Sequence, residues 1–154
     1  MKKVLLSLLV VIVLSISSLG IYSAVKAKKE ILSTKEVYSK TMSCIKKSKT
    51  AKKDAKCMDE AVDEYEKIIN DYTEKLRKNV YCGARRGLNR STVAWEKFVS
   101  EDFGFITDTI EMPNPASALR AAAVSRLLVY KSRAEELEMI YDTYMDLKDK
   151  KLVE

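Results

Sequence analysis

The feature that most constrains the fold is a long amphipathic run between Met58 and Leu76. Apolar side chains recur there every three or four residues, and mainly acidic residues fill the remaining positions. The apolar set is Met58, Ala61, Val62, Tyr65, Ile68, Ile69, Tyr72 and Leu76. Because an α-helix turns once every 3.6 residues, this pattern places one continuous apolar stripe along a helix. Such a stripe requires partner helices to cover it.

Three further segments have helical periodicity. A short first helix is predicted at residues 28–43, and a third helix at residues 88–105. A long final helix is predicted to begin after Ser117 as the N-cap and to end near Lys148. No segment alternates with a period of two for long enough to predict a strand.

Breaks between these segments are marked by glycine and proline. Cys82-Gly83 and Gly87 are predicted to interrupt the chain before the third helix, and Met112-Pro113-Asn114-Pro115 to interrupt it before the last. With only 4 Gly and 2 Pro in 154 residues, the rest of the chain consists of good helix formers. The predicted fold class is all-α, a small antiparallel bundle of about four helices.

Residues 1–27 have the layout of an export signal. Two lysines precede the apolar stretch Val4–Leu14, and small and polar residues follow. This order is typical of a cleaved secretory signal. An uncleaved membrane anchor is the alternative, because Val4–Val25 is 22 residues long and about 20 suffice to cross a bilayer. Either way, residues 28–150 are predicted to form a helical domain outside the cytoplasm, periplasmic or secreted, with the retained leader giving a membrane-anchored form.

Charge and composition exclude several classes of function. The formal charge is +6, and three of the 28 basic residues lie in the leader, so 25 remain against 22 acidic residues, a net charge of +3. Because no concentrated basic stripe with stacking aromatics is present, no nucleic-acid partner is expected. The absence of histidine removes the usual general base and the commonest metal ligand. No catalytic residue, cofactor or metal is predicted, and the chain is not expected to be an enzyme.

Two carboxylate clusters are the strongest candidates for acid–base chemistry. They are Glu101-Asp102 and Glu135-Glu136 with Glu138. Paired carboxylates can exchange protons when their surroundings separate their pKa values. Each cluster lies on a predicted helix among lysines and arginines, so a solvated helix face is the favoured interpretation.

Cys44 and Cys57 flank a twelve-residue segment, Ile45–Lys56, which is predicted to be a linker between the first two helices. In an oxidising compartment the two cysteines are expected to form a disulfide that closes this helix connection. Closing a loop of this size stabilises a fold by about 3 kcal/mol in the chain-entropy account. The third cysteine, Cys82, is left over, to be free, buried or paired between chains. A zinc site is not expected, because the chain has no histidine and no Cys-x-x-Cys pair.

The predicted linker is strongly basic, with a single acid, Asp54. Its lysines are Lys46, Lys47, Lys49, Lys52, Lys53 and Lys56. One interpretation is a solvated linker, and the other is a contact surface for an acidic partner such as an anionic membrane surface or an envelope polymer. Arg85 and Arg86 are further candidate partner contacts.

Several spacings resemble the LprI-type lysozyme-inhibitor domain family, whose members are small exported bacterial proteins. The resemblance rests on Cys44 and Cys57 thirteen positions apart, Asp63 and Tyr72 in an acidic helix, Leu88, Trp95 and Phe98, and Arg133 followed by Leu137. The resemblance spans residues 44–137. The chain departs from the family pattern at Thr92, Val99 and Ser100, and it lacks the family's later cysteine pair.

The resemblance implies a helical, disulfide-supported exported domain that is not an enzyme. Its motif core would be Leu88, Trp95, Phe98, Arg133 and Leu137. Lysozyme inhibition is attributed to some members of that family. A domain of net charge +3 would meet long-range repulsion from a basic animal-type lysozyme. A cation from residues 45–56, or Arg85 or Arg86, could still plug a carboxylate-lined cleft.

The expectation drawn from the sequence is therefore an exported, non-enzymatic helical binding module. Its expected partner is a protein of the cell envelope, with a lysozyme-type cell-wall hydrolase as the specific hypothesis. The alternative is a membrane-tethered structural envelope protein, held near anionic lipid or polymer by the lysines.

Overall fold

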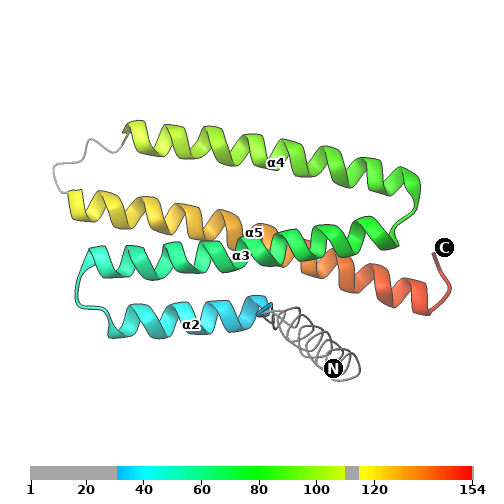
Figure 1. Cartoon of the computed structure of the whole chain (residues 1–154), viewed down its shortest axis with the longest axis horizontal. Helices are drawn as coiled ribbons and strands as arrows, with labels where there is room; N and C mark the ends of the chain where they lie inside the picture. Colours follow the sequence, from blue (N-terminus) through cyan, green and yellow to red (C-terminus); the bar gives the residue numbers. More distant parts are fainter. Residues whose placement is uncertain (1–30, 110–114, 154) are drawn as a thin grey trace, which may run out of the picture. The chain divides into compact units, whose positions relative to one another are not determined.

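The computed structural model describes residues 31–109 and 115–153. The predicted leader, residues 1–27, lies outside the described residues, as does the Met112–Asn114 part of the predicted break. The described chain forms helices α2 (Thr34–Lys47), α3 (Ala51–Asn79), α4 (Cys82–Thr109) and α5 (Pro115–Asp149), with no strand among them (Figure 1). The predicted all-α bundle of about four helices is confirmed.

Helices α3 and α5 form the central pair of residues 31–153. Four polar contacts join them: Asp54 to Arg120 at 3.1 Å, Asp59 to Arg126 at 2.6 Å, Tyr72 to Glu138 at 3.2 Å, and Asn79 to Tyr144 at 2.9 Å. Because the numbers of the partners rise together along both helices, α3 and α5 run parallel. Consecutive helices are antiparallel, as predicted, and the parallel pair follows because the chain reverses twice between α3 and α5 (Figure 1).

Helices α2 and α4 pack against the central pair at separate places. Each contacts both α3 and α5, and within the described chain the two do not contact each other. Figure 1 shows α2 and α4 on opposite sides of α3. The central pair therefore carries most of the packing, and each of the other helices covers part of it.

The hydrophobic core follows the stripe that the sequence predicts on α3. Tyr65, Ile68, Leu76, Leu137 and Val37 are the largest fully buried side chains. Ala55, Met58 and Ala123 form a second, smaller cluster of buried residues. Among the side chains described on α4, Val99 is the only one that is buried. The core is therefore built mainly between α3 and α5, and α4 is the least embedded helix.

Helix α2 begins at a capping box that the predicted range of 28–43 does not take into account. The Ser33 hydroxyl accepts a hydrogen bond from the Glu36 backbone N–H at 3.3 Å, and the Glu36 carboxylate accepts one from the Ser33 backbone N–H at 2.8 Å. The Ser33 backbone N–H and the Ser33 hydroxyl, which also donates to this carboxylate at 2.7 Å, lower the pKa of the Glu36 carboxyl. The reciprocal pair satisfies backbone donors at the helix start, so the helix begins at Thr34.

The predicted twelve-residue linker at Ile45–Lys56 is wrong. Helix α2 continues to Lys47 and α3 starts at Ala51, so only residues 48–50 separate the two helices. Thr50 caps α3, its hydroxyl accepting from the backbone N–H of Lys53 at 3.3 Å. Lysine is a good helix former, and a run of lysines with a cap in its middle favours two helix ends over an extended loop.

Two other predicted boundaries are also wrong. Helix α4 starts at Cys82, so Gly83 and Gly87 lie inside it and do not break it. An isolated glycine costs a helix only about 1 kcal/mol relative to alanine. Helix α5 starts at Pro115, so Ser117 is not its N-cap. Proline is well suited to the first position of a helix because its missing N–H would have no partner there.

Within residues 31–109 and 115–153, no helix combines the length and the apolar character that crossing a bilayer requires.

Candidate functional site

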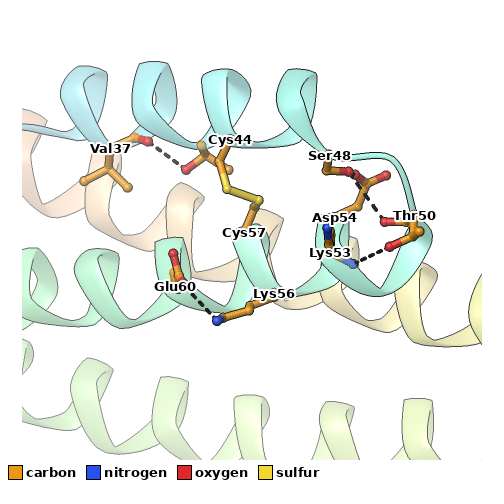
Figure 2. Close-up of a disulfide and its surroundings, with 10 residues drawn as sticks. Val37, Cys44, Ser48, Thr50, Lys53, Asp54, Lys56, Cys57 and Glu60 are labelled. Carbon is orange, nitrogen blue, oxygen red and sulfur yellow. Dashed lines mark hydrogen bonds and ion pairs between the residues drawn. A yellow bond between two sulfur atoms is a disulfide. The ribbon is translucent and has the colours of Figure 1, made fainter.

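A disulfide joins the facing ends of α2 and α3. Cys44 of α2 and Cys57 of α3 are bonded, with their Cα atoms 5.9 Å apart (Figure 2). The predicted pairing is confirmed. Disulfides persist in oxidising compartments, so the bond indicates that the domain resides in one. Cys82 is free and exposed at the first residue of α4.

The residues 46–56, here called the basic turn, carry the six lysines that the sequence analysis singled out. Lys46 and Lys47 end α2, Lys49 lies between the helices, and Lys52, Lys53 and Lys56 lie in the first turns of α3. All six side chains are exposed. Lys56 lies 3.9 Å from Glu60, and no ion pair within the described chain involves the other five.

Asp54, the one acid of the basic turn, is occupied by neighbours. Its carboxylate accepts a hydrogen bond from the Ser48 hydroxyl and pairs with the Arg120 guanidinium at 3.1 Å (Figure 2 shows the contact with Ser48). It therefore fixes the geometry of the turn and neutralises Arg120 of α5. The charges of the other five lysines have no ion-pair partner within the described chain, and the positive end of the α3 dipole adds to them.

Arg85 and Arg86 do not join the basic turn. Both are exposed near the start of α4, and Arg85 donates a hydrogen bond to the Val80 carbonyl at 3.3 Å. Helix α3 separates the two places, and its 29 residues correspond to about 40 Å of helix. The candidate contacts predicted from the sequence therefore fall into two separate basic surfaces.

Four of the five carboxylates that could have carried acid–base chemistry are engaged in local contacts. Glu101 lies 3.7 Å from Lys97, Glu135 lies 2.8 Å from Lys131, and Glu136 lies 2.7 Å from Arg133. Glu138 is half-buried and accepts hydrogen bonds from Thr34 at 2.6 Å and Tyr72 at 3.2 Å. Within the described chain, no three His, Cys, Asp or Glu side chains lie close enough together to hold a metal ion.

The residues of the family motif occupy different environments. Leu137 is fully buried, and Leu88 and Trp95 are partly buried against the core. The Trp95 ring meets the Tyr130 ring edge-on at 5.2 Å, so it packs against α5. Phe98 departs from the expected motif core because its side chain is 51% exposed.

A cleft beneath α4 is a feature that the sequence analysis did not predict. It consists of two consecutive cavities between α4 and the α3–α5 pair, of about 190 and 230 Å³. Arg133 lines both and so lies between them. The available sequence signal was that Arg133 falls on the apolar stripe of α5, three residues after Tyr130 and four before Leu137.

Comparisons of the chain with protein-family models, with curated proteins and with solved structures find no match. The LprI resemblance contributes a hypothesis about the partner.

Proposed function

We propose that the chain is an exported binding module without enzymatic activity, whose basic turn contacts an acidic surface of a protein partner in the cell envelope. The observation that supports this proposal is the Cys44–Cys57 disulfide beside five exposed lysines that form no ion pair within the described chain. Because the turn is short and covalently closed, few backbone conformations have to be given up on binding.

The available side chains support the non-enzymatic part of the proposal. The chain has no histidine, and four of the five candidate carboxylates pair with lysine and arginine or accept hydrogen bonds from Thr34 and Tyr72. A binding module needs none of these groups to be reactive. It needs a preformed surface of one charge, which the basic turn supplies.

The proposed partner is a lysozyme-type cell-wall hydrolase, the class that the LprI resemblance implies. The cleft of such an enzyme carries two catalytic carboxylates, and a lysine is a compact charge on a long stem that can enter a cleft. The net charge of +3 opposes long-range attraction to a basic lysozyme, so affinity would arise from local pairs. Moderate salt would screen the repulsion and leave a desolvated lysine–carboxylate pair largely intact.

The proposed location is the periplasm or the exterior of the cell. The disulfide supports an oxidising compartment, and the layout of residues 1–27 supports export. A membrane-tethered form that retains the leader is the alternative. The mass of the mature protein separates the two forms, because only the tethered form retains residues 1–27.

The experiment is an assay of cell-wall hydrolysis by lysozyme with the oxidised mature protein added at micromolar concentration. The proposal predicts slower hydrolysis and a saturable dependence on the added protein. Unchanged hydrolysis together with binding to phosphatidylglycerol vesicles would favour the tethered structural protein. Unchanged hydrolysis without vesicle binding would remove the lysozyme hypothesis.

A further inference from the structure

Helix α4 packs against α3 and α5 but does not fill the space between itself and these two helices. Val99 is the only buried side chain among those described on this helix. At Gly87, a Cβ atom built on the backbone would meet nothing within 4 Å. Gly87 lines the larger of the two cavities. The first half of α4 therefore leaves an open space where a larger side chain would fit.

This larger cavity, here called the apolar compartment, has a volume of about 230 Å³. Most of its wall is aliphatic: Leu76, Val80, Ala84, Leu88, Leu137 and Ile140. Ser91, Glu136 and Arg133 supply its polar groups. An apolar cavity with a few polar groups at one end is the usual form of a small-molecule site, the polar groups fixing the orientation of the ligand.

The guanidinium of Arg133 is incompletely satisfied. The residue is only 7% exposed, because it lies on the face of α5 that packs against α4. Its Nη1 pairs with Glu136 at 2.7 Å and its Nη2 donates to the Ser91 hydroxyl at 3.1 Å. Its Nε is buried with no hydrogen-bond partner in the described chain. A buried, charged donor without an acceptor is costly, and an oxygen acceptor from a ligand would remove that cost.

Charge around the apolar compartment favours an anion. From Lys75 to Trp95 the chain has six lysines and arginines and no acid. Arg85, Arg86 and Arg90 are exposed on the same turns of α4 that line the compartment and form no ion pair within the described chain. Glu136 is the one acid that lines the compartment, and its side chain is half exposed. The surrounding field attracts an anionic ligand toward the compartment.

The neighbouring cavity of about 190 Å³ has a different character. Glu66 and Glu96 line it together with Trp95, Tyr130 and Arg133. Two carboxylates there disfavour an anion, so a negatively charged ligand is expected to approach from the arginine side. Arg133, which lines both cavities, is then the inner end of the apolar compartment.

We propose that the apolar compartment beneath α4 binds a monocarboxylate amphiphile, with its hydrocarbon chain against Leu88 and Leu137 and its carboxylate on Arg133. The aliphatic wall selects the chain, and the guanidinium of Arg133, which turns its buried and unpartnered Nε toward the compartment on binding, selects the charged oxygen. An acceptor on Nε forms a charge-assisted hydrogen bond, which is stronger than a neutral one. This site is independent of the basic turn and of its proposed protein partner.

The test uses decanoate as the probe and the fluorescence of the single tryptophan as the readout. Trp95 is the only tryptophan in the chain, and its ring centroid lies 6.0 Å from the Arg133 guanidinium carbon. We expect a saturable fluorescence change with decanoate and binding of decanol weaker by about tenfold, the range expected for loss of a charge-assisted hydrogen bond. No saturable change, or equal affinity for both probes, would overturn the proposal.

Gly87→Leu is the decisive variant, because the new side chain fills the compartment. The matched control is Gly104→Leu, the same substitution in the same helix, where a Cβ atom also meets nothing within 4 Å and the residue does not line the compartment. Both changes remove a helix glycine, so both variants are expected to fold. We expect Gly87→Leu to lose decanoate binding and Gly104→Leu to keep it. Decanoate binding to both with the same affinity would contradict the assignment.

Arg133→Gln tests the carboxylate contact. We expect decanoate to bind this variant about tenfold more weakly, while decanol keeps its affinity, because only the carboxylate uses the charged donor. Equal weakening of both probes would show that Arg133 shapes the compartment without recognising the charge. If this variant does not fold, the Gly87→Leu and Gly104→Leu pair still decides whether the compartment is the site.

Discussion

At the residue scale, two tyrosines on α3 combine packing with hydrogen bonding. Tyr65 is fully buried and its hydroxyl donates to the Thr34 carbonyl at 3.4 Å. Tyr72 donates to Glu138 at 3.2 Å. Burial, with Glu135 near Tyr65 and Glu138 near Tyr72, raises the pKa of each phenol to about 12. Both side chains therefore favour the neutral hydroxyl in the folded protein.

These raised pKa values predict a loss of stability in alkali. An unfolded tyrosine ionises near pH 10, so between about pH 10 and 12 the unfolded state binds fewer protons than the folded state. The stabilisation from these hydroxyls is complete below pH 10 and is lost as the pH rises toward 12. We expect the free energy of unfolding to fall more steeply there in the wild type than in Tyr72→Phe. Lysines also titrate in this pH range, so Tyr81→Phe, at an exposed tyrosine, is the control. If stability depended on pH in the same way in Tyr72→Phe and in Tyr81→Phe, the assignment would be contradicted.

Leu137 is one of the largest buried side chains of the hydrophobic core. Leu137 is 1% exposed, whereas Leu128 on the same helix is 58% exposed. Leu137→Ala is expected to lower the free energy of unfolding by about 2–5 kcal/mol, because it removes buried methyl groups and leaves a cavity. Leu128→Ala is expected to change it by less than about 0.5 kcal/mol. Urea unfolding measures both, and equal effects would show that α5 packs through another face.

At the element scale, the α2–α3 connection depends on its covalent closure. Residues 48–50 are the only non-helical ones between the helices, and six lysines repel one another around them. The capping threonine and the Asp54 contacts offset part of that repulsion, and the disulfide limits the freedom of the unfolded chain. The disulfide therefore stabilises a connection that the repulsion between its lysines disfavours.

The double substitution Cys44→Ser/Cys57→Ser is accordingly expected to lower the free energy of unfolding by about 3 kcal/mol. Urea unfolding under oxidising conditions provides the measurement. Cys82→Ser serves as the control and is expected to leave stability unchanged, because Cys82 is exposed and free. A double variant as stable as the wild type would mean that the caps alone fix the connection.

The positions of helices were predictable from apolar periodicity, and their ends were not. The stripe from Met58 to Leu76 predicted the body of α3, which extends seven residues before it and three after it. The ends depend on caps such as Thr50, and on first-position residues such as Pro115, which periodicity does not report. Gly87 was expected to break a helix, but a glycine facing open space costs little and α4 continues through it.

At the scale of the whole described domain, the parallel pairing of α3 and α5 could not be predicted from the sequence. Amphipathic patterns predict which face of a helix is covered, and they do not say which helix covers it. The contacts Asp59–Arg126 and Tyr72–Glu138 fix the register only once the chain has folded. The cleft beneath α4 was missed for the same reason, although Arg133 on an apolar stripe was a visible signal.

In the whole described domain, the two basic surfaces lie at opposite ends of α3. The basic turn lies at its start, and Arg85, Arg86 and Arg90 lie beyond its end. Only the first surface is closed by a disulfide. If binding depended on net charge alone, the two surfaces would contribute equally, so comparing them distinguishes a specific contact from general electrostatics.

The most direct test of the basic turn as the binding surface compares two triple charge reversals in a lysozyme-binding titration. Lys49→Glu/Lys52→Glu/Lys53→Glu and Arg85→Glu/Arg86→Glu/Arg90→Glu change the net charge equally, and both make the protein more attractive at long range to a basic lysozyme. The account predicts that the lysine variant loses at least about tenfold in affinity, while the arginine variant binds as tightly as the wild type or more tightly. Equal affinities for the two variants would contradict it.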